Sequence, residues 1–280
     1  MAVKLLSNGG TLREVPTKLM IFPGGEPHVQ IQERWDRGAE LIIDCRFKSN
    51  DDLMTAIALT DAARRLGAEN VSLFIPYFPG ARQDRVKRLT GESLTCKVYA
   101  DIINSQGYDR VIVVDPHSDV TPALLDRVVV ISQKDIFKQY YGDGLLLKYN
   151  GLIAPDAGAR KKVEELNDEY RLPIYYGAKH RDMATGKLSH FSCDELPVGR
   201  YLLTDDICDG GGTFVGLANA IENWRGIGLD LFVTHGILSK GTNELLKVYD
   251  NIVTTDSVYC GLPHEEIEVI KLLPIVRNLI

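Results

Sequence analysis

Short runs of β-branched and aliphatic residues alternate with helix-like segments along most of this chain, and this alternation constrains the fold more than any other feature. Strand–helix–strand repetition is typical of parallel sheets covered by helices, so we expect an α/β fold. The apolar spacing predicts helices at about 51–66 (capped by Asn50), 94–106, 159–167, 213–224 and 240–249. The runs that fit strands are 18–22, 28–32, 40–47, 71–78, 110–115, 151–155, 173–179, 200–206, 229–236 and 251–256.

The strand runs exceed what one small doubly wound sheet usually holds, so we expect two domains, each with its own mainly parallel sheet. A Gly/Pro turn between the first two runs predicts an antiparallel hairpin appended to that plan. The turn-rich segment 141–149 suggests a boundary that gives domains at 1–141 and 142–268. The apolar tail at 269–280 is expected to pack back on the N-terminal domain.

Composition narrows the class of protein. The chain has 280 residues, of which 45% are hydrophobic and 25% charged, and its formal net charge is -6. This balance offers no support for a nucleic-acid or membrane partner. The five cysteines are widely spaced without a CxxC pair, which indicates a reducing compartment and no structural zinc. The N-terminus lacks the apolar core of a signal peptide. We therefore expect a cytoplasmic α/β enzyme.

The stretch YLLTDDICDGGGTFVGLANAI, at 201–221, has a strand, a glycine-rich loop and then a helical pattern. Glycines and a helix N-terminus expose backbone N–H groups that can hold a phosphate. Asp205 and Asp206 would repel that phosphate, but carboxylates suit sugar hydroxyls or magnesium. Together these residues predict a ribose-phosphate site with the phosphate on 209–213. The alternative is a tight turn with a capping aspartate and no ligand.

Basic residues cluster behind the strand run at 71–78. A solvated basic turn is the simpler interpretation, whereas a functional cluster here suits a polyphosphate. The chain has neither GxxxxGK[ST] nor GxGxxG, so a P-loop and a Rossmann dinucleotide fingerprint are excluded. The basic residues are Arg82, Arg85, Lys87 and Arg88.

Other strand runs also end in polar residues, at the sheet edge where α/β proteins bind ligands. Asp115 and His117 end one run, although a lone histidine is more often structural. Asp156 ends another, before a turn of small residues that leads into a helix. The polar, glycine-broken segment 177–191 begins with Lys179, His180 and Arg181. It could be a mobile lid that carries cations, and an exposed hairpin is the alternative.

With these stretches in order, the sequence resembles the ribose-phosphate diphosphokinases (PRPP synthetases), which share the type I phosphoribosyltransferase fold. The resemblance covers nearly the whole chain, and IPYF..ARQDR is its most specific string. It therefore implies two phosphoribosyltransferase-like domains. The strings that carry it are FPGGEPHVQI, NDDLMTAIALTDAARRLGAENVSLFIPYFPGARQDR, VIVVDPH, APDAGARKKV, AKHR, LLTDDICDGGGT, FVTHGILS and IVTTDSV.

The resemblance implies a reaction in which the C1 hydroxyl of ribose 5-phosphate attacks the β-phosphorus of Mg-ATP and AMP leaves. Such chemistry needs positioning, metal and cations more than a covalent nucleophile. The ATP site would lie between subunits, so at least a dimer is implied. The implied residues are Phe22, Gly24, Glu26, Arg82, Gln83 and Asp84 for ATP; His117, Asp156 and Asp115 for Mg²⁺; Lys179 and Arg181 for catalysis; and Asp205, Asp206, Asp209, Gly210, Gly211, Gly212 and Thr213 for the ribose phosphate.

Two departures from the family pattern bear on the substrates. The family usually has Phe-x-Asp/Asn-Gly-Glu, whereas Gly24 stands here at the polar position. Gly210 replaces the usual first threonine of the phosphate loop, which removes a hydroxyl and a methyl group. A loop with less side chain could admit a substituted phosphate. ADP-ribose, giving ADP-ribose pyrophosphate in an NAD-restoring pathway, is therefore an alternative acceptor to the favoured ribose 5-phosphate.

A more distant alternative is a phosphoribosyltransferase that consumes PRPP with a base. Such an enzyme shares the ribose-phosphate loop but needs neither RQDR nor the Lys179 and Arg181 pair. An inactive relative that only binds and regulates a true synthetase is disfavoured, because the candidate catalytic residues are all present. Allosteric regulation and the choice between dimer and hexamer stay open.

Overall fold

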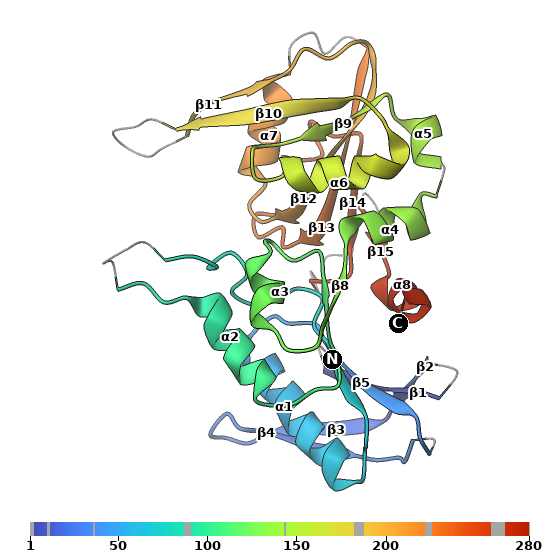
Figure 1. The fold of residues 1–280 in the computed structure, drawn as a ribbon. Helices are drawn as coiled ribbons and strands as arrows, with labels where there is room; N and C mark the ends of the chain where they lie inside the picture. The colour runs from blue at the N-terminus through green and yellow to red at the C-terminus, as the bar shows by residue number, and fades with distance from the viewer. Residues whose placement is uncertain are drawn as a thin grey trace. The chain divides into compact units, whose positions relative to one another are not determined.

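The chain forms two compact units, one made chiefly of Met1–Ser132 and the other of Gln133–Asp256 and Cys260–Leu279. The structure is a computed structural model (Figure 1). None of the helices within its described ranges has the length and apolarity needed to span a bilayer. The described residues are 3–9, 12–35, 37–86, 91–142, 144–181, 188–221, 226–258 and 267–279.

The first unit has a mixed sheet in the order β2-β1-β5-β6-β7-β8. The strands from β5 to β8 are parallel, and β1 and β2 extend the sheet in antiparallel fashion. β6 and β7 are buried along their whole length, as expected for parallel strands covered on both faces. The strands are β1 (Val3–Asn8), β2 (Leu12–Val15), β5 (Glu40–Cys45), β6 (Val71–Phe74), β7 (Val111–Val114) and β8 (Val128–Ile131), and the helices are α1 (Asn50–Arg65), α2 (Thr95–Asn104) and α3 (Val120–Leu124).

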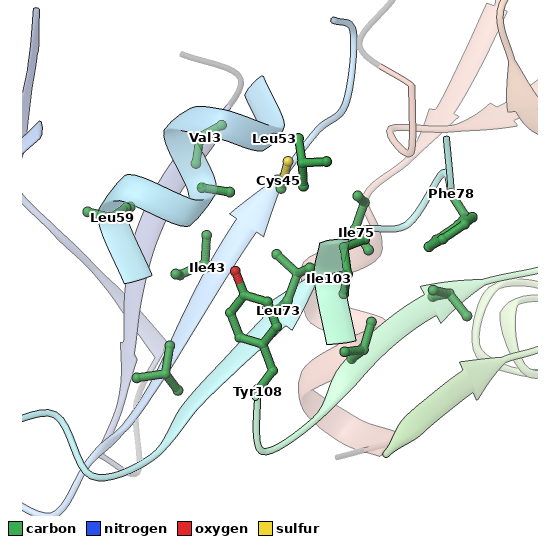
Figure 2. Close-up of a cluster of buried hydrophobic side chains, with 14 of the residues drawn as sticks. Val3, Ile43, Cys45, Leu53, Leu59, Leu73, Ile75, Phe78, Ile103 and Tyr108 are labelled. Carbon is green, nitrogen blue, oxygen red and sulfur yellow. The ribbon is translucent and has the colours of Figure 1, made fainter. Parts of the chain in front are cut away.

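The expected N-terminal hairpin is confirmed, because β3 (Thr17–Ile21) pairs with β4 (Pro27–Ile31) in antiparallel register. The hairpin contacts α1 through β4 (Figure 1). In the core, Ile43 of β5, Leu73 of β6 and Ile103 of α2 lie around the ring of Tyr108 (Figure 2). The Tyr108 hydroxyl is 2.8 Å from the Thr60 hydroxyl, so this buried polar group is satisfied.

The second unit has a sheet in the order β11-β10-β9-β12-β13-β14-β15, parallel except for the antiparallel β11. Its chain order reverses between β9 and β12, and ligands bind at such a switch point in open α/β sheets. The strands are β9 (Gly151–Ala154), β10 (Ile174–Arg181), β11 (Leu188–Cys193), β12 (Gly199–Cys208), β13 (Ile227–Gly236), β14 (Asn251–Thr255) and β15 (Ile267–Ile270), and the helices are α4 (Gln133–Tyr140), α5 (Gly144–Lys148), α6 (Arg160–Tyr170), α7 (Gly212–Asn219) and α8 (Leu272–Leu279).

The unit boundary lies at 132/133, before the turn-rich segment that the sequence suggested. Phe137 of α4 packs edge-to-face on Phe232 of β13 with ring centroids 4.5 Å apart, and this contact places α4 in the second unit. The apolar tail forms α8, which belongs to the second unit. The Leu272 N–H at its start donates to the Asp256 carboxylate at 2.9 Å.

Two local expectations were wrong. The first helix is capped by Ser49 and not by Asn50, because Ser49 has the extended backbone of a cap. Its N–H donates to the Asp52 carboxylate at 2.9 Å. Residues 240–249 form turns in place of a helix. Gly241 has a left-handed φ of +73°, which interrupts a helix at its start.

Candidate active site

In the first unit, the segment after β6 folds back against the start of α2. The Gln83 N–H donates to the Gly80 carbonyl at 2.8 Å, and the Cys96 N–H donates to the Gln83 carbonyl at 3.3 Å. Gly80 has φ +72°, and a Cβ there would lie 3.1 Å from the backbone nitrogen of Cys96, so this close approach requires glycine. The turn leaves Arg82 and Gln83 exposed.

Asp84, by contrast, is buried and joins two loops of the first unit. Its carboxylate accepts hydrogen bonds from the Ser118 hydroxyl at 2.5 Å and from Arg85 Nε at 3.2 Å. Burial alone would raise the pKa of Asp84, but these bonds and the nearby His117 outweigh it and hold the pKa below its ordinary value. Asp84 therefore ties the exposed Arg82–Gln83 turn to the segment that follows β7.

Asp115 and His117 lie directly after β7, at the carboxyl end of the parallel strands. Asp115 is buried and has a left-handed φ of +37°. Its N–H donates to the Ile131 carbonyl of β8 at 2.8 Å. Strain of this kind in a non-glycine residue persists where surrounding structure imposes it, often at functional sites. His117 is half-buried two residues further along.

The hairpin tip between β3 and β4 carries the remaining candidate residues of the first unit. The Phe22 N–H donates to the Glu26 carbonyl at 2.9 Å, which closes the tip. Phe22 is nevertheless 50% exposed, and its ring stands 5.8 Å from that of His28. An exposed aromatic ring on a hairpin tip is available to stack on a ligand or a partner.

In the second unit, Asp156 and Lys179 form an ion pair beside the switch point. Asp156 follows β9, and Lys179 comes from the neighbouring β10. The other carboxylate oxygen of Asp156 accepts the N–H groups of Gly158 at 2.8 Å and Ala159 at 3.2 Å. Burial would raise the pKa of Asp156, but Lys179 and these two N–H groups hold it below its ordinary value. Asp156 is therefore ionised at neutral pH.

Asp205 and Asp206 lie near the carboxyl end of β12, on the other side of the same switch point. Asp206 is buried and stands 3.4 Å from Lys162 Nζ of α6. Burial, together with the adjacent carboxylates of Asp206 and Asp156, raises the pKa of Asp205 well above its ordinary value. When ionised, the Asp205 carboxylate can bind a cation; when protonated, it can donate a hydrogen bond.

The raised pKa of Asp205 predicts a pH-dependent stability. A carboxyl with a raised pKa in the folded state stabilises the fold at low pH, and this contribution is lost as the pH rises through the folded pKa. Asp205→Asn removes the charge, so its Tm should exceed that of the native protein at pH 8. The gap should close towards pH ~4, near the ordinary aspartate pKa.

Thermal unfolding scans at several pH values measure this gap, with the exposed Glu244→Gln of the same unit as control. If the Tm of Asp205→Asn at pH 8 is equal to or below that of the native protein, the pKa of Asp205 is not raised in the folded state.

The loop after β12 leads directly into α7. Gly211 is the N-cap residue of α7 and has a left-handed φ of +75°, a conformation that glycine adopts without a steric cost. A Cβ at Gly212 would meet nothing within 4 Å, so this backbone is open to an approaching group. The Asp209 carboxylate accepts the Ser239 hydroxyl at 2.6 Å. We call residues 209–213 the phosphate loop.

In the first unit the structure joins Asp84 to the segment after β7, and the hairpin tip belongs to a separate part that contacts α1. In the second unit it gathers Asp156, Lys179 and Asp205 around the switch point. Sequence reasoning missed the polar partners Ser118, Lys162 and Ser239, which lie in segments that it did not connect to the candidates. Applying the carboxyl-end rule to β13 would have found Ser239. Lys87 and Arg88 lie outside the described residues, as do the side chains of His180 and Arg181 and the middle of the expected lid, 182–187. The described parts of β10 and β11 form an antiparallel hairpin.

Comparisons with known proteins identify the family of this chain. The sequence model of the N-terminal domain of ribose phosphate pyrophosphokinase matches residues 6–107. The ribose-phosphate pyrophosphokinase of Maricaulis maris is 32% identical over 85% of this chain and 77% of its own length. That of Hyphomonas neptunium is 29% identical over 94% of this chain and 86% of its own length.

A solved structure shares the fold. The phosphoribosylpyrophosphate synthetase of Mycobacterium smegmatis matches with a TM-score of 0.76 over 95% of this chain and 89% of its own, at 21% identity. The fold and these relatives define an α/β enzyme of the diphosphotransferase class. The chain belongs to the ribose-phosphate pyrophosphokinase family.

Proposed function

We propose that this protein transfers the β,γ-diphosphoryl group of ATP to the C1 hydroxyl of ribose 5-phosphate, giving PRPP and AMP. The family supports the reaction class. The observation that carries the assignment is the order of groups along one strand. Two carboxylates near the end of β12 are followed by an open glycine loop that caps α7.

That order suits a ribose phosphate. In the proposal, backbone N–H groups of the phosphate loop and the α7 N-terminus hold the 5′-phosphate. Asp205 and Asp206 accept hydrogen bonds from the ribose hydroxyls. The low exposure of Asp206 and its ion pair with Lys162 support a fixed orientation for this acceptor.

Lys179 and Arg181 are the proposed catalytic residues. The C1 oxygen attacks the β-phosphorus, the bond from that phosphorus to the bridging oxygen of AMP breaks, and the diphosphoryl group moves. Negative charge spreads over the phosphoryl oxygens as this happens, and fixed cations stabilise it. The ion pair with Asp156 supports the role of Lys179, because it holds the ammonium at the carboxyl edge of the sheet.

The ATP site is proposed to use Arg82, Gln83 and the hairpin tip. Exposure supports this for Arg82 and Gln83, while the buried Asp84 would orient their turn and not touch the nucleotide. Phe22, with Gly24 and Glu26, would contact the adenine of a neighbouring subunit, which requires at least a dimer.

Magnesium is proposed as the metal. The candidate ligand in the second unit is Asp156, and those in the first unit are His117 and Asp115. Among the described residues no group of three or more His, Cys, Asp and Glu is arranged to hold an ion. Mg²⁺ is often bound by one or two carboxylates together with waters and substrate phosphates, so a single protein carboxylate can contribute to such a site. Asp156, ionised by its hydrogen bonds, has the required chemistry. When bound, the ion would neutralise phosphate charge.

ADP-ribose is a second candidate acceptor, supported by the space around the loop. A Cβ at Gly212 would meet nothing within 4 Å, whereas the three atoms nearest to a Cβ at Gly210 belong to Lys240, so the open space lies beside Gly212. A substituted phosphate could therefore be accommodated there.

Incubation with Mg-ATP and each acceptor tests both candidates. We expect AMP release with ribose 5-phosphate. Release with ADP-ribose alone would establish the second acceptor in its place. Consumption of PRPP and a nucleobase, with no ATP-dependent AMP formation, would instead indicate a phosphoribosyltransferase.

A further inference from the structure

The segment after β13, residues 237–241, is held against the end of β12, and we call it the β13 turn. The N–H groups of Ile237 and Leu238 donate to the Cys208 carbonyl at 2.9 and 3.1 Å. The Ser239 N–H donates to the Asp209 carbonyl at 3.2 Å. The β13 turn is therefore built onto the phosphate loop.

The backbone of the β13 turn is also conformationally restricted. Leu238 is buried and has a left-handed φ of +51°, which is uncommon for a residue with a side chain. The Gly241 N–H donates to the Leu238 carbonyl at 2.8 Å and closes the turn. Such a conformation persists only where the surrounding packing imposes it. The position of Lys240, between these two residues, is thus set by the fold.

The Lys240 side chain runs over Gly210 of the phosphate loop. A Cβ at position 210 would lie 3.3 Å from both Cδ and Cε of Lys240, tighter than ordinary van der Waals contact. The lysine methylenes therefore occupy the room that a side chain at 210 would need. Its ammonium is one bond beyond Cε, and within the described part of the chain it forms no ion pair.

The negative charges near the phosphate loop indicate a role for the Lys240 ammonium. Asp205, Asp206 and Asp209 lie within a few residues of the proposed phosphate position. A phosphate monoester adds a charge of about -1.5 to -2 at neutral pH. Lys162 offsets the charge of Asp206, and the hydroxyl of Ser239 binds Asp209. A further cation at the loop would reduce the repulsion between these carboxylates and a bound phosphate.

We propose that Lys240 is a specificity-determining residue of the acceptor site. Its methylenes fill the space above Gly210, and its ammonium binds the acceptor phosphate in place of a side chain at 210. This inference rests on the proposed function, because the phosphate loop must be the acceptor site.

Calorimetric titration with ribose 5-phosphate, without ATP, tests the charge. Lys240→Met keeps an unbranched stem without the ammonium, and we expect its Kd to rise about tenfold, as for loss of a charge-assisted hydrogen bond. Lys240→Arg should stay within about threefold of the native protein. Lys247→Met is the matched control, because Lys247 is exposed and pairs with Glu244. An unchanged Kd in Lys240→Met, or an equal loss in Lys247→Met, would overturn the proposal.

Steady-state kinetics separate this role from a structural one. Lys240→Met should raise KM for ribose 5-phosphate about tenfold and leave KM for ATP and kcat within about twofold. A comparable rise in KM for ATP would overturn the assignment to the acceptor. ADP-ribose is titrated in parallel. If Lys240→Met lost affinity for ADP-ribose but not for ribose 5-phosphate, Lys240 would not bind the phosphate of ribose 5-phosphate.

A double-mutant cycle tests the packing. Gly210→Thr should weaken acceptor binding in the native background, where the new side chain meets Lys240, and weaken it less in the Lys240→Ala background. If Gly210→Thr weakened acceptor binding equally in the two backgrounds, Lys240 would not occupy the space that a side chain at 210 needs. Because binding needs no transfer, a native protein that binds ribose 5-phosphate through Lys240 but releases no AMP would contradict the proposed function alone. A native protein that does not bind ribose 5-phosphate would overturn the inference itself.

Discussion

Replacing Lys179 with alanine is expected to lower kcat at least about 100-fold. Removing one preorganised group that stabilises transition-state charge typically costs this much. The variant also leaves the Asp156 carboxylate without its ion-pair partner, close to where the transferred phosphoryl groups are proposed to lie. That uncompensated negative charge adds to the loss, because it repels the charge that develops during transfer.

AMP release under saturating ATP and ribose 5-phosphate measures this effect. Lys161→Ala is a suitable control, because Lys161 belongs to the same unit and forms an exposed pair with Glu165. Its kcat should stay within about twofold of the native value. Near-normal turnover in Lys179→Ala would exclude Lys179 from the catalytic role.

Asp230→Ala is expected to destabilise the second unit by about 3–5 kcal/mol, the loss typical of breaking a buried ion pair from one side. Asp230 is fully buried in β13 and accepts hydrogen bonds from Arg200 at 2.5 Å, Tyr149 at 2.7 Å and Asn251 at 2.9 Å. Alanine would leave these donors without their shared acceptor. Their hydrogen bonds outweigh burial and hold the pKa of Asp230 below its ordinary value, so its stabilisation is present at neutral pH and lost in acid.

Urea unfolding measures the difference in free energy. Asp250→Ala is the matched control, because Asp250 stands 3.6 Å from the same arginine but is 55% exposed, and its loss should stay below about 1 kcal/mol. Asp230→Asn keeps one acceptor oxygen, so its loss of unfolding free energy should lie between those of Asp230→Ala and Asp250→Ala. A loss below 1 kcal/mol in Asp230→Ala would show that the buried cluster does not stabilise the unit. Asp230 lies in the amino-terminal half of β13, away from the site, so folded variants should keep their kcat.

The sequence predicted best the elements that are buried on both faces. β6, β7 and β9 are short, wholly buried runs, and parallel strands covered by helices have this pattern. β8 and β15 were missed although their sequences, VVVI and IEVI, are rich in β-branched residues; each strand has only four residues. The helix expected at 240–249 did not form, because Leu245 and Tyr249 are buried against the second core through turns that start at a left-handed Gly241.

For the candidate site, local pattern identified single residues but not their partners. Asp156 and Lys179 were each recognised at the end of a strand, yet their pairing depends on β9 and β10 being neighbours in the sheet. The contact of Lys240 with Gly210 joins segments thirty positions apart, and it exists because β12 and β13 are adjacent and parallel. Sequence spacing carries no information about such contacts until the strand order is known.

By itself, then, the sequence determined the α/β class, the family resemblance and the glycine loop, because each rests on residues that are close together in the chain. Tertiary structure alone decided which charges are neutralised. It paired Lys162 with Asp206, and it brought the Ser118 hydroxyl to the buried Asp84 carboxylate. It also placed the Lys240 side chain beside Gly210 of the phosphate loop. The physical reason is that a charge interacts with whatever lies within a few ångströms of it, and sheet order sets those neighbours.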